Sequence, residues 1–315
     1  MTATVDLVEV APRDGFQPIG PWIPTETKIA TVRRLAAAGL RRIEIGSFVS
    51  ASAIPQLRDA AALVEAAAAI PGLRPQVLVP TAKRAREAVA AGARFLVYVL
   101  SASEAHNWSN VRRPVAESAE DYARMLDALP ADVAVRINLA TAFDCPFDGR
   151  MAVPPVLDLI GRLAALRPDV EICLCDTTGR ATPDHVAQLA SAAAARCPDV
   201  AAWAYHAHDT YGLGLATTYA AYQAGIRVFD AAAGGLGGCP FAPGATGNVA
   251  TEDVVWMFER MGIPTGVALD ALLPIAADVA ALPGASAGGR ARAALASRGA
   301  CPVPEAAGAA AKAQA

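Results

Sequence analysis

Val5-Asp-Leu-Val-Glu-Val10 is followed by Ala11-Pro-Arg13-Asp14-Gly15-Phe-Gln17, and this junction of an apolar run with a turn sets the pattern that the chain repeats. The first stretch predicts a short β-strand, and the Pro and Gly of the second predict a turn. Apolar side chains then recur at helical spacing from Thr25 until Gly39, which predicts a helix that ends at the glycine. The unit is therefore a strand, a turn and a helix.

The same unit recurs along the chain. Further strands are predicted at Arg42–Ile45, Gln76–Val79, Phe95–Leu100, Val133–Leu139, Glu171–Cys175, Ala201–His206 and Val228–Ala231. Helical stretches are predicted to follow them from near Ile54, Thr81, Glu117, Pro154, Thr182, Gly214 and Thr251. Eight units over about 260 residues are typical of an α/β fold of the (β/α)8 TIM-barrel type. A doubly wound sheet is the alternative, but no Gly-x-Gly-x-x-Gly opens the first helix.

The barrel is expected to form a single catalytic domain over residues 1–285. Residues 286–315 are rich in Ala and Gly and carry few bulky side chains towards their end. After Leu269 we expect a last short helical segment, and we expect the extension to end in a mobile, partly disordered tail.

Composition and charge argue against several classes of protein. Hydrophobic residues make up 54% of the 315, yet no apolar run reaches the ~20 residues of a membrane helix. A net charge of −3 gives no basic field for nucleic acid. The N-terminus has no signal or transit pattern, which predicts a cytoplasmic protein. The cysteines show neither a disulfide framework nor paired zinc spacing and are expected to be reduced; they are Cys145, Cys173, Cys175, Cys197, Cys239 and Cys301.

A glycine-rich stretch, Ala233-Gly-Gly-Leu-Gly-Gly-Cys239-Pro-Phe-Ala-Pro-Gly-Ala-Thr-Gly-Asn248, follows the eighth strand. Its glycines and prolines exclude a helix, and it lacks the polar, Ser-rich composition of a linker. Glycine permits positive φ and close approach of the backbone to a ligand. The stretch therefore predicts a shaped loop over a buried site, with the Cys239 thiol and the Asn248 amide as its reactive groups.

Polar side chains stand at the carboxyl ends of several strands, where TIM barrels build their active sites. They are Arg13 and Asp14 after the first strand, Glu44 and Ser47 in and after the second, Asp176 and Thr177 at the end of the sixth, and His206, His208 and Asp209 at the end of the seventh.

Two of these residues, His206 and His208, predict a metal site. Alternate residues of a strand face the same side, so both imidazoles can converge inside the barrel mouth. A single histidine would more often be a packed core residue, but Asp14 and Asn248 are available from other loops. Two imidazoles, a carboxylate and an amide oxygen suit Mg²⁺ or Mn²⁺ and would also accept Zn²⁺.

The remaining cysteines near these strands give weaker signals. Cys173 and Cys175 share one face of the sixth strand, but no second pair completes a zinc site. They are interpreted as small core side chains. Cys145 fits either a loop anchor or a site residue.

Five motifs carry a resemblance to a known family. They are Pro12-Arg-Asp-Gly15, Ile43-Glu44 with Ser47-Phe-Val-Ser50 and Pro55-Gln56, Asp176-Thr-Thr-Gly179, His206-Ala-His-Asp-Thr-Tyr-Gly212, and the stretch Gly234–Val254. From about Val5 to Leu273 the chain resembles 3-hydroxy-3-methylglutaryl-CoA lyase, in the metal-dependent TIM-barrel superfamily that also holds isopropylmalate synthase. The Arg-Asp and His-x-His motifs are shared across that superfamily, whereas Gly-Gly-Leu-Gly-Gly-Cys-Pro with a downstream Gly-Asn marks the lyase branch.

The resemblance implies an acyl-CoA substrate, a divalent metal, Mg²⁺ or Mn²⁺, and a homodimer that acts in leucine catabolism. It implies metal ligands Asp14, His206, His208 and Asn248, catalytic residues Arg13, Cys239, His206, Glu44 and Asp176, and substrate-binding residues Arg13, Gln17, Ser47 and Thr177. Arg13 would stabilise the oxyanion of a thioester enolate, and Cys239 would return a proton to its carbon. Either His206 or Asp14 would take the proton of the substrate hydroxyl.

Three functions remain as hypotheses. The first is a lyase that splits a 3-hydroxy-3-methylglutaryl-CoA-like substrate into acetyl-CoA and a keto acid, acetoacetate. A citramalyl-CoA or other 3-hydroxy-3-alkylglutaryl-CoA lyase is its alternative, because Pro18–Trp22, Gly46 and Leu139–Cys145 depart from the family pattern around the acyl pocket. The second is a Claisen-type synthase, which would need a C-terminal regulatory region that 315 residues hardly allow. The third is a non-catalytic barrel, which would have lost ligands, and none is lost.

Overall fold

The eight predicted strands close into a parallel barrel, so the predicted TIM-barrel fold is confirmed. The structure is a computed structural model that describes residues 4–167, 169–238 and 246–296. Neighbouring strands follow the order β1-β10-β9-β8-β5-β4-β3-β2, and β2 pairs with β1 to complete the circle. The barrel strands are β1 (Asp6–Glu9), β2 (Arg42–Ser47), β3 (Arg74–Val79), β4 (Phe95–Ser101), β5 (Ala134–Ala140), β8 (Glu171–Asp176), β9 (Ala202–Ala207) and β10 (Val228–Ala231).

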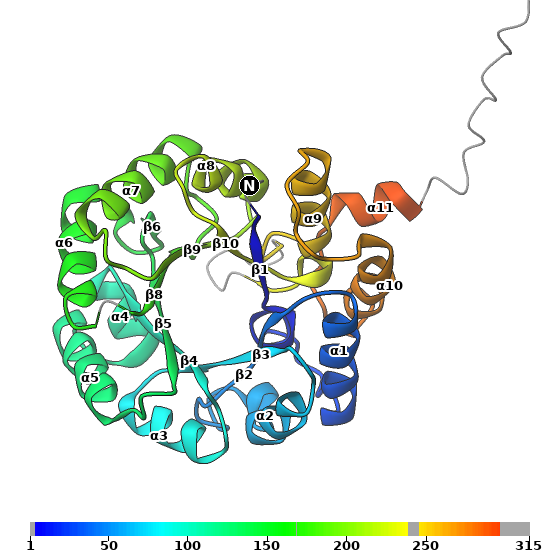
Figure 1. Cartoon of the computed structure of the whole chain (residues 1–315), viewed down its shortest axis with the longest axis horizontal. Helices are drawn as coiled ribbons and strands as arrows, with labels where there is room; N and C mark the ends of the chain where they lie inside the picture. The colour runs from blue at the N-terminus through cyan, green and yellow to red at the C-terminus, as the bar shows by residue number, and fades with distance from the viewer. Residues whose placement is uncertain (1–3, 168, 239–245, 297–315) are drawn as a thin grey trace, which may run out of the picture.

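Helices up to α9 alternate with the strands and form the outer ring seen in Figure 1, and α10 and α11 follow them in the chain. The helices are α1 (Thr25–Ala37), α2 (Ala60–Ala68), α3 (Ala82–Ala90), α4 (Glu104–Val111), α5 (Val115–Ala128), α6 (Val153–Ala164), α7 (Pro183–Arg196), α8 (Gly214–Gln223), α9 (Thr251–Arg260), α10 (Leu269–Ala280) and α11 (Arg290–Ala296). In the described part of the chain, no helix combines the length and the apolar character that crossing a bilayer requires.

Two predicted helix starts differ from the structure, and two helices, α4 and α11, were not predicted. The helix expected near Ile54 begins at Ala60, because Pro55–Leu57 form a separate 3₁₀ turn, η2. The helix expected near Glu117 begins at Val115, directly after Pro114. Helix α4 was missed, although the Ser103 hydroxyl accepts a hydrogen bond from the His106 amide at 3.1 Å and caps its first turn.

A further feature that the sequence pattern did not predict is a hairpin between β5 and α6. Its two short strands are β6 (Asp144–Cys145) and β7 (Gly149–Arg150), paired antiparallel outside the barrel. Strands of two residues are too short for an apolar alternation to be visible in the sequence.

The apolar core lies between the barrel and its helices. Leu35 of α1, Tyr122 of α5, Ile160 of α6 and Phe258 of α9 are fully buried against the strands. Burial of one such side chain stabilises the fold by about 1.5–3 kcal/mol, so the helix layer holds the barrel closed by many such contacts.

The interior of the barrel, in contrast, contains buried charges. Arg42 of β2 donates to both carboxylate oxygens of Glu171 in β8 at 2.9 and 2.8 Å. Arg136 of β5 donates to Asp230 of β10 at 2.7 Å and lies 3.3 Å from Glu171. Buried charges are tolerated when they are paired, and these pairs run through the middle of the barrel.

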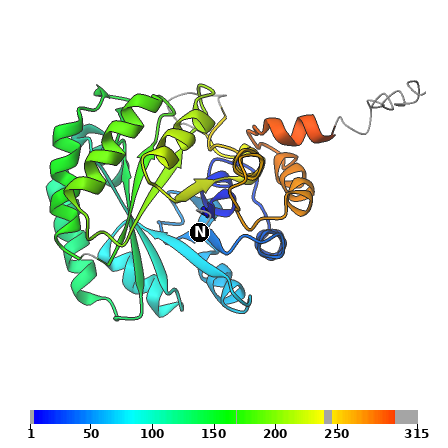
Figure 2. The same cartoon turned by 45° about the horizontal axis from the view of Figure 1, so that its top comes forward.

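The C-terminal part of the described chain lies outside the ring of helices, where Figure 2 shows α11 beside α10. The Asp253 carboxylate at the start of α9 accepts hydrogen bonds from the amides of Arg290 and Ala291, which open α11. Just before α11, the Gly288 amide donates to the Gly234 carbonyl oxygen at 2.8 Å. Helix α10 is the helical segment predicted after Leu269, whereas α11 was not predicted, and the predicted mobile tail lies outside the described residues.

Candidate active site

A cavity of about 1160 Å³ opens at the carboxyl ends of the barrel strands. Of the residues singled out in the sequence, its wall contains Arg13, Asp14, Gln17, Ser47, Thr177, His206 and His208. Glu44, Asp176 and Asn248 do not form part of that wall. Loops from opposite ends of the chain therefore meet at one site, as the barrel topology requires.

Arg13 and Asp14 are presented by a single π-helical turn, η1 (Ala11–Gly15), directly after β1. The turn is tight because the amides of Arg13, Asp14 and Gly15 all donate to the Val10 carbonyl oxygen. Arg13 is 7% exposed, so its guanidinium acts within a largely desolvated cavity.

Two carboxylates hold the Arg13 side chain. Its Nε donates to Glu44 Oε1, and its Nη1 donates to Asp14 Oδ1 at 2.5 Å. Burial alone would lower the pKa of Arg13, but the charges of Glu44 and Asp14 outweigh it and raise that pKa. Glu44 is fully buried behind the arginine, so it orients Arg13 from outside the cavity wall.

Asp14, His206 and His208 form a cluster that can hold a metal ion. One ligand atom from each of the three residues lies within 4.8 Å of the others. His208 Nε2 lies 3.9 Å from Asp14 Oδ2. The imidazole rings of His206 and His208 lie 5.1 Å apart between centroids, as expected for alternate residues that face one side.

Asn248 completes this donor set. Its Nδ2 donates to Asp14 Oδ2 at 2.7 Å and to the Leu236 carbonyl oxygen at 2.9 Å. Within the described residues, its buried Oδ1 atom has no hydrogen-bond partner. A buried amide oxygen without a partner is costly, and a cation would satisfy it. The four side chains therefore fit a divalent ion of the Mg²⁺ or Mn²⁺ type.

The pKa values of the three titratable residues in the cluster shift in different directions: that of His206 is raised, and those of His208 and Asp14 are lowered. Burial lowers the pKa of His206, but the hydrogen bond to Asp230 and other nearby negative charges raise it to about 9. The pKa of His208 falls to about 4, because burial and the charge of His206 both disfavour its protonated form. Burial raises the pKa of Asp14, yet Arg13 and the two histidines outweigh this and hold it well below its usual range. Asp14 is therefore negatively charged at neutral pH.

The glycine-rich stretch approaches Asn248 so closely that a side chain would not fit. Gly237 has φ +136°, and a Cβ there would lie 2.7 Å from Asn248 Nδ2. At Gly247 a Cβ would meet the Gly237 carbonyl carbon at 2.5 Å. These close contacts explain why the described parts of the predicted loop need glycine. Cys239 lies outside the described residues.

Glu9 is a site residue that the sequence reasoning missed. It is fully buried at the end of β1, where its Oε1 accepts from the amides of Ala11 and Ala233 at 2.8 and 2.9 Å. Its Oε2 accepts from the Thr251 hydroxyl at 2.8 Å. One carboxylate thereby ties the loop after β1 to both ends of the glycine-rich stretch. A lone Glu among apolar strand residues was the only signal for it.

Asp176 does not line the cavity. Its two carboxylate oxygens accept from the backbone amides of Arg180 and Ala181, both at 3.1 Å, so it shapes the loop after β8. Burial raises the pKa of Asp176 to about 7. The neighbouring Thr177 does line the cavity, and its hydroxyl accepts from the Thr141 amide at 2.8 Å.

The cysteines of β8 have different surroundings. Cys173 and Cys175 are both buried in the core, as interpreted from the sequence, and Cys175 also lines the cavity. Their sulfur atoms are 3.7 Å apart. Cys145 in the hairpin lies 3.0 Å from the Ser103 hydroxyl, a contact that fits the loop-anchor interpretation.

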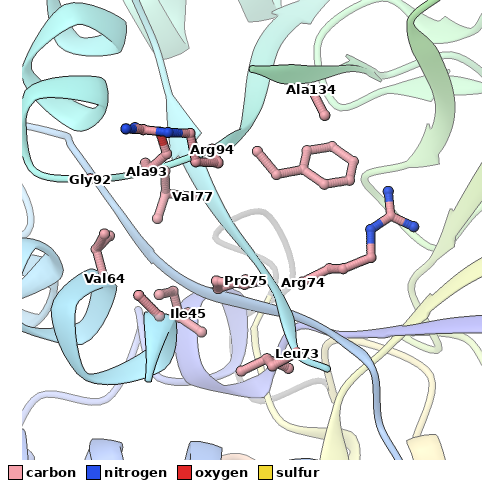
Figure 3. Close-up of a pocket in the computed structure, with 12 residues that line it drawn as sticks. Ile45, Val64, Leu73, Arg74, Pro75, Val77, Gly92, Ala93, Arg94 and Ala134 are labelled. Carbon is pink, nitrogen blue, oxygen red and sulfur yellow. The ribbon is translucent and has the colours of Figure 1, made fainter. Parts of the chain in front are cut away.

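A second cavity, of about 290 Å³, lies at the opposite end of the barrel (Figure 3). Its wall is mostly aliphatic and includes Ile45, Val64 and Val77, with Arg74 and Arg94 at its edge. The residues that line it include no histidine, cysteine or carboxylate, so they supply no acid–base or metal chemistry.

Comparison with known proteins bears on this site. A family model described as HMGL-like matches residues 4–279. An (R)-citramalyl-CoA lyase of Chloroflexus aurantiacus is 42% identical, covering 85% of this chain and 88% of its own. A hydroxymethylglutaryl-CoA lyase of Bacillus subtilis is 41% identical, covering 86% and 91%. The structure of an HMG-CoA lyase from Acinetobacter baumannii in complex with coenzyme A and 3-methylmalate is 40% identical, with a TM-score of 0.88 over 96% of this chain and 100% of that chain.

Proposed function

The chain belongs to the HMGL-like family and is a carbon–carbon lyase, and on that premise we propose that it cleaves 3-hydroxy-3-methylglutaryl-CoA to acetyl-CoA and acetoacetate. The observation that carries the proposal is the convergence of Asp14, His206, His208 and Asn248 beside the buried Arg13. This arrangement places a possible metal-binding site beside the cationic Arg13 side chain, and the cleavage of a 3-hydroxyacyl-CoA requires both.

The four clustered side chains would hold a divalent ion, and Asn248 Oδ1 and His206 Nε2 are the atoms free to face it. When bound there, the ion would supply Lewis-acid chemistry that lowers the pKa of the substrate hydroxyl and helps to hold the substrate for carbon–carbon cleavage. Asp14 and His206 are the two candidates for accepting the hydroxyl proton, and His206 could accept it only at an Nε2 atom that is not bound to the ion.

Arg13 supports the next stage of the reaction. When the bond to the acetyl unit breaks, negative charge develops on the thioester oxygen of the enolate. The Arg13 guanidinium is always cationic, and Glu44 and Asp14 already orient its donors. Such preorganised charge stabilises an oxyanion without further reorganisation. Cys239 is assigned the protonation of the enolate carbon from the family resemblance, since it lies outside the described residues.

The outer part of the cavity supports a coenzyme A substrate. Arg58 and Arg112 are exposed and line the cavity, where they can pair with phosphate groups. Trp22 lines the same region, with the Arg58 guanidinium carbon 3.9 Å from its ring centroid. An anionic, extended cofactor would find opposite charge at this mouth, despite the negative charge of the whole chain.

A second candidate substrate is citramalyl-CoA, favoured by the similarity to the Chloroflexus enzyme. The same machinery would then release pyruvate in place of acetoacetate. A panel assay decides between them: acetyl-CoA release is measured with each acyl-CoA, and the keto acid is identified. A higher kcat/KM for 3-hydroxy-3-methylglutaryl-CoA supports the first proposal, and a higher value for citramalyl-CoA replaces it with the second.

The proposal extends to the setting of the enzyme, for which the family resemblance is the support. We assign it to leucine breakdown in the cytoplasm, as a homodimer. Light scattering of the purified chain tests the dimer, because a single 32.3 kDa species would contradict it.

A further inference from the structure

We propose that Asp230 is a positioning residue that holds His206 in the orientation and tautomer needed to bind the metal ion. The inference rests on the proposed metal site and assigns a role to a residue that the sequence reasoning did not single out. Asp230 lies on β10 directly opposite His206 on β9, as paired residues of neighbouring parallel strands. Its Oδ2 atom is 3.1 Å from His206 Nδ1.

The carboxylate of Asp230 is itself fixed. It is 2% exposed, and its Oδ2 also accepts from Arg136 Nη2 at 2.7 Å. Arg136 is fully buried and is held in turn by Asn138, whose Oδ1 accepts from Arg136 Nε at 2.8 Å. Because the arginine cannot move without losing these bonds, Asp230 presents its oxygen to His206 at a defined place.

An ionised carboxylate can only accept, so His206 Nδ1 carries the proton of their hydrogen bond. This leaves His206 Nε2 as the ligand atom for the cluster with Asp14 and His208. His208 has no such support among the described residues, because its buried Nδ1 lacks a hydrogen-bond partner. Asp230 is therefore the carboxylate that orients one of the two imidazoles and increases its strength as a ligand.

Loss of this contact would let the His206 ring rotate and exchange tautomers. Partners of this kind typically change metal affinity 10–100-fold when they are removed. Asp230→Ala and Asp230→Asn are therefore expected to bind Mn²⁺ about 10–100-fold more weakly than the wild type. Asparagine retains an oxygen that can accept from Nδ1 but lacks the charge, so its loss should be the smaller of the two.

Glu171 offers a matched control within the same network. It is a barrel carboxylate, 8% exposed, that lies 3.3 Å from Arg136 through Oε1, and it pairs with Arg42 and Arg136 instead of His206. Glu171→Gln removes a buried charge next to Arg136 as Asp230→Asn does. It should lower the melting temperature while leaving Mn²⁺ affinity within a factor of two of wild type.

The experiment is calorimetric titration of the metal-free wild type and the three variants with Mn²⁺, with thermal unfolding recorded in parallel. If Asp230→Ala does not fold, Asp230→Asn decides, because it keeps the shape of the side chain. Wild-type affinity in a folded Asp230 variant, or an equal loss in Glu171→Gln, overturns the inference.

The same titration separates this inference from the proposed reaction. Mn²⁺ binding that depends on Asp230, in a protein that cleaves no acyl-CoA, would refute the reaction and leave the inference standing. Cleavage by a wild type whose Mn²⁺ affinity equals that of Asp230→Asn would do the reverse. A wild type that binds no Mn²⁺ refutes both.

Discussion

Asn248 donates its side-chain amide to Asp14 across 2.7 Å, although 234 positions separate the two residues in the chain. The contact joins the loop after β1 to the glycine-rich stretch after β10 and so assembles the metal cluster from the two ends of the barrel. Because the side-chain nitrogen of Asn248 makes this contact, its Oδ1 atom has no hydrogen-bond partner within the described residues and is available to a cation. The geometry of this contact depends on the glycines around it, and their replacement is the first prediction.

Gly237→Ala should damage the site without unfolding the barrel. The new Cβ would lie 2.7 Å from Asn248 Nδ2, and the backbone at φ +136° does not suit an alanine. Displacing Asn248 should lower kcat/KM by roughly 10²-fold, as misplacement of a site group by about 1 Å can. Gly225→Ala is the control, because Gly225 also has positive φ but a Cβ there meets nothing within 4 Å. Equal activity of the two variants would contradict the role given to Gly237.

Arg13→Lys should lower kcat by ~10²- to 10³-fold with little change in KM. Lysine keeps the charge, but it lacks the planar donors that contact Glu44 and Asp14 together. The enolate charge appears only as the bond breaks, so the loss belongs to the transition state. Steady-state kinetics check this. A near-normal kcat with a strongly raised KM would show that Arg13 serves only in substrate binding.

Cys239→Ser should lower kcat by ~10²-fold or more while leaving metal affinity intact, since positioned proton transfer is typically worth 10²- to 10⁴-fold. Cys197→Ser is the control, because Cys197 directly follows α7 and does not line the cavity. Cys175 is a poorer control, since it lines the cavity. Equal loss in the Cys239 and Cys197 variants would remove Cys239 from the mechanism.

The stability of the fold should fall between pH 4.5 and pH 7 through Glu9. Burial raises the pKa of Glu9 from 4.5 to about 7. In this window the folded protein keeps a proton that the unfolded chain has released, so the free energy of unfolding decreases as pH rises. At 1.36 kcal/mol for each unit of pKa, the change is about 3 kcal/mol.

Denaturant unfolding at pH 4.5, 6 and 7.5 measures this slope for the wild type and for Glu9→Gln, which has no carboxyl group to titrate. The free energy of unfolding of the wild type should decrease relative to that of the variant as pH rises. Parallel pH profiles for the two proteins would show that Glu9 titrates alike in the folded and unfolded chain.

Much of the fold could be predicted because apolar runs and helical spacing directly reflect burial against a core. Every barrel strand was located, since each is a continuous buried run flanked by turn residues. The β6–β7 hairpin carries no such run. Cys175 was placed in the core from its strand alternation, but the sequence does not reveal where the cavity reaches the strand.

The candidate site could be predicted only in part for a related reason. Asp14, His206 and His208 stand at strand ends and have reactive side chains, so local pattern finds them. Glu9 and Asp230 lie inside strands, and their roles depend on partners in other elements. The register of β10 against β9 places Asp230 beside His206, and that register is a property of the closed barrel.

The dependence of cleavage on the ion held by Asp14, His206, His208 and Asn248 is the claim on which the rest depends. It is tested by measuring acetyl-CoA release from 3-hydroxy-3-methylglutaryl-CoA after treatment with excess chelator and again after addition of Mg²⁺ or Mn²⁺, for the wild type and for His208→Ala. We expect no release in chelator, recovery of the wild type with metal, and no recovery of His208→Ala at the same metal concentration, because one ligand is gone. Full turnover of the wild type in excess chelator would contradict the claim.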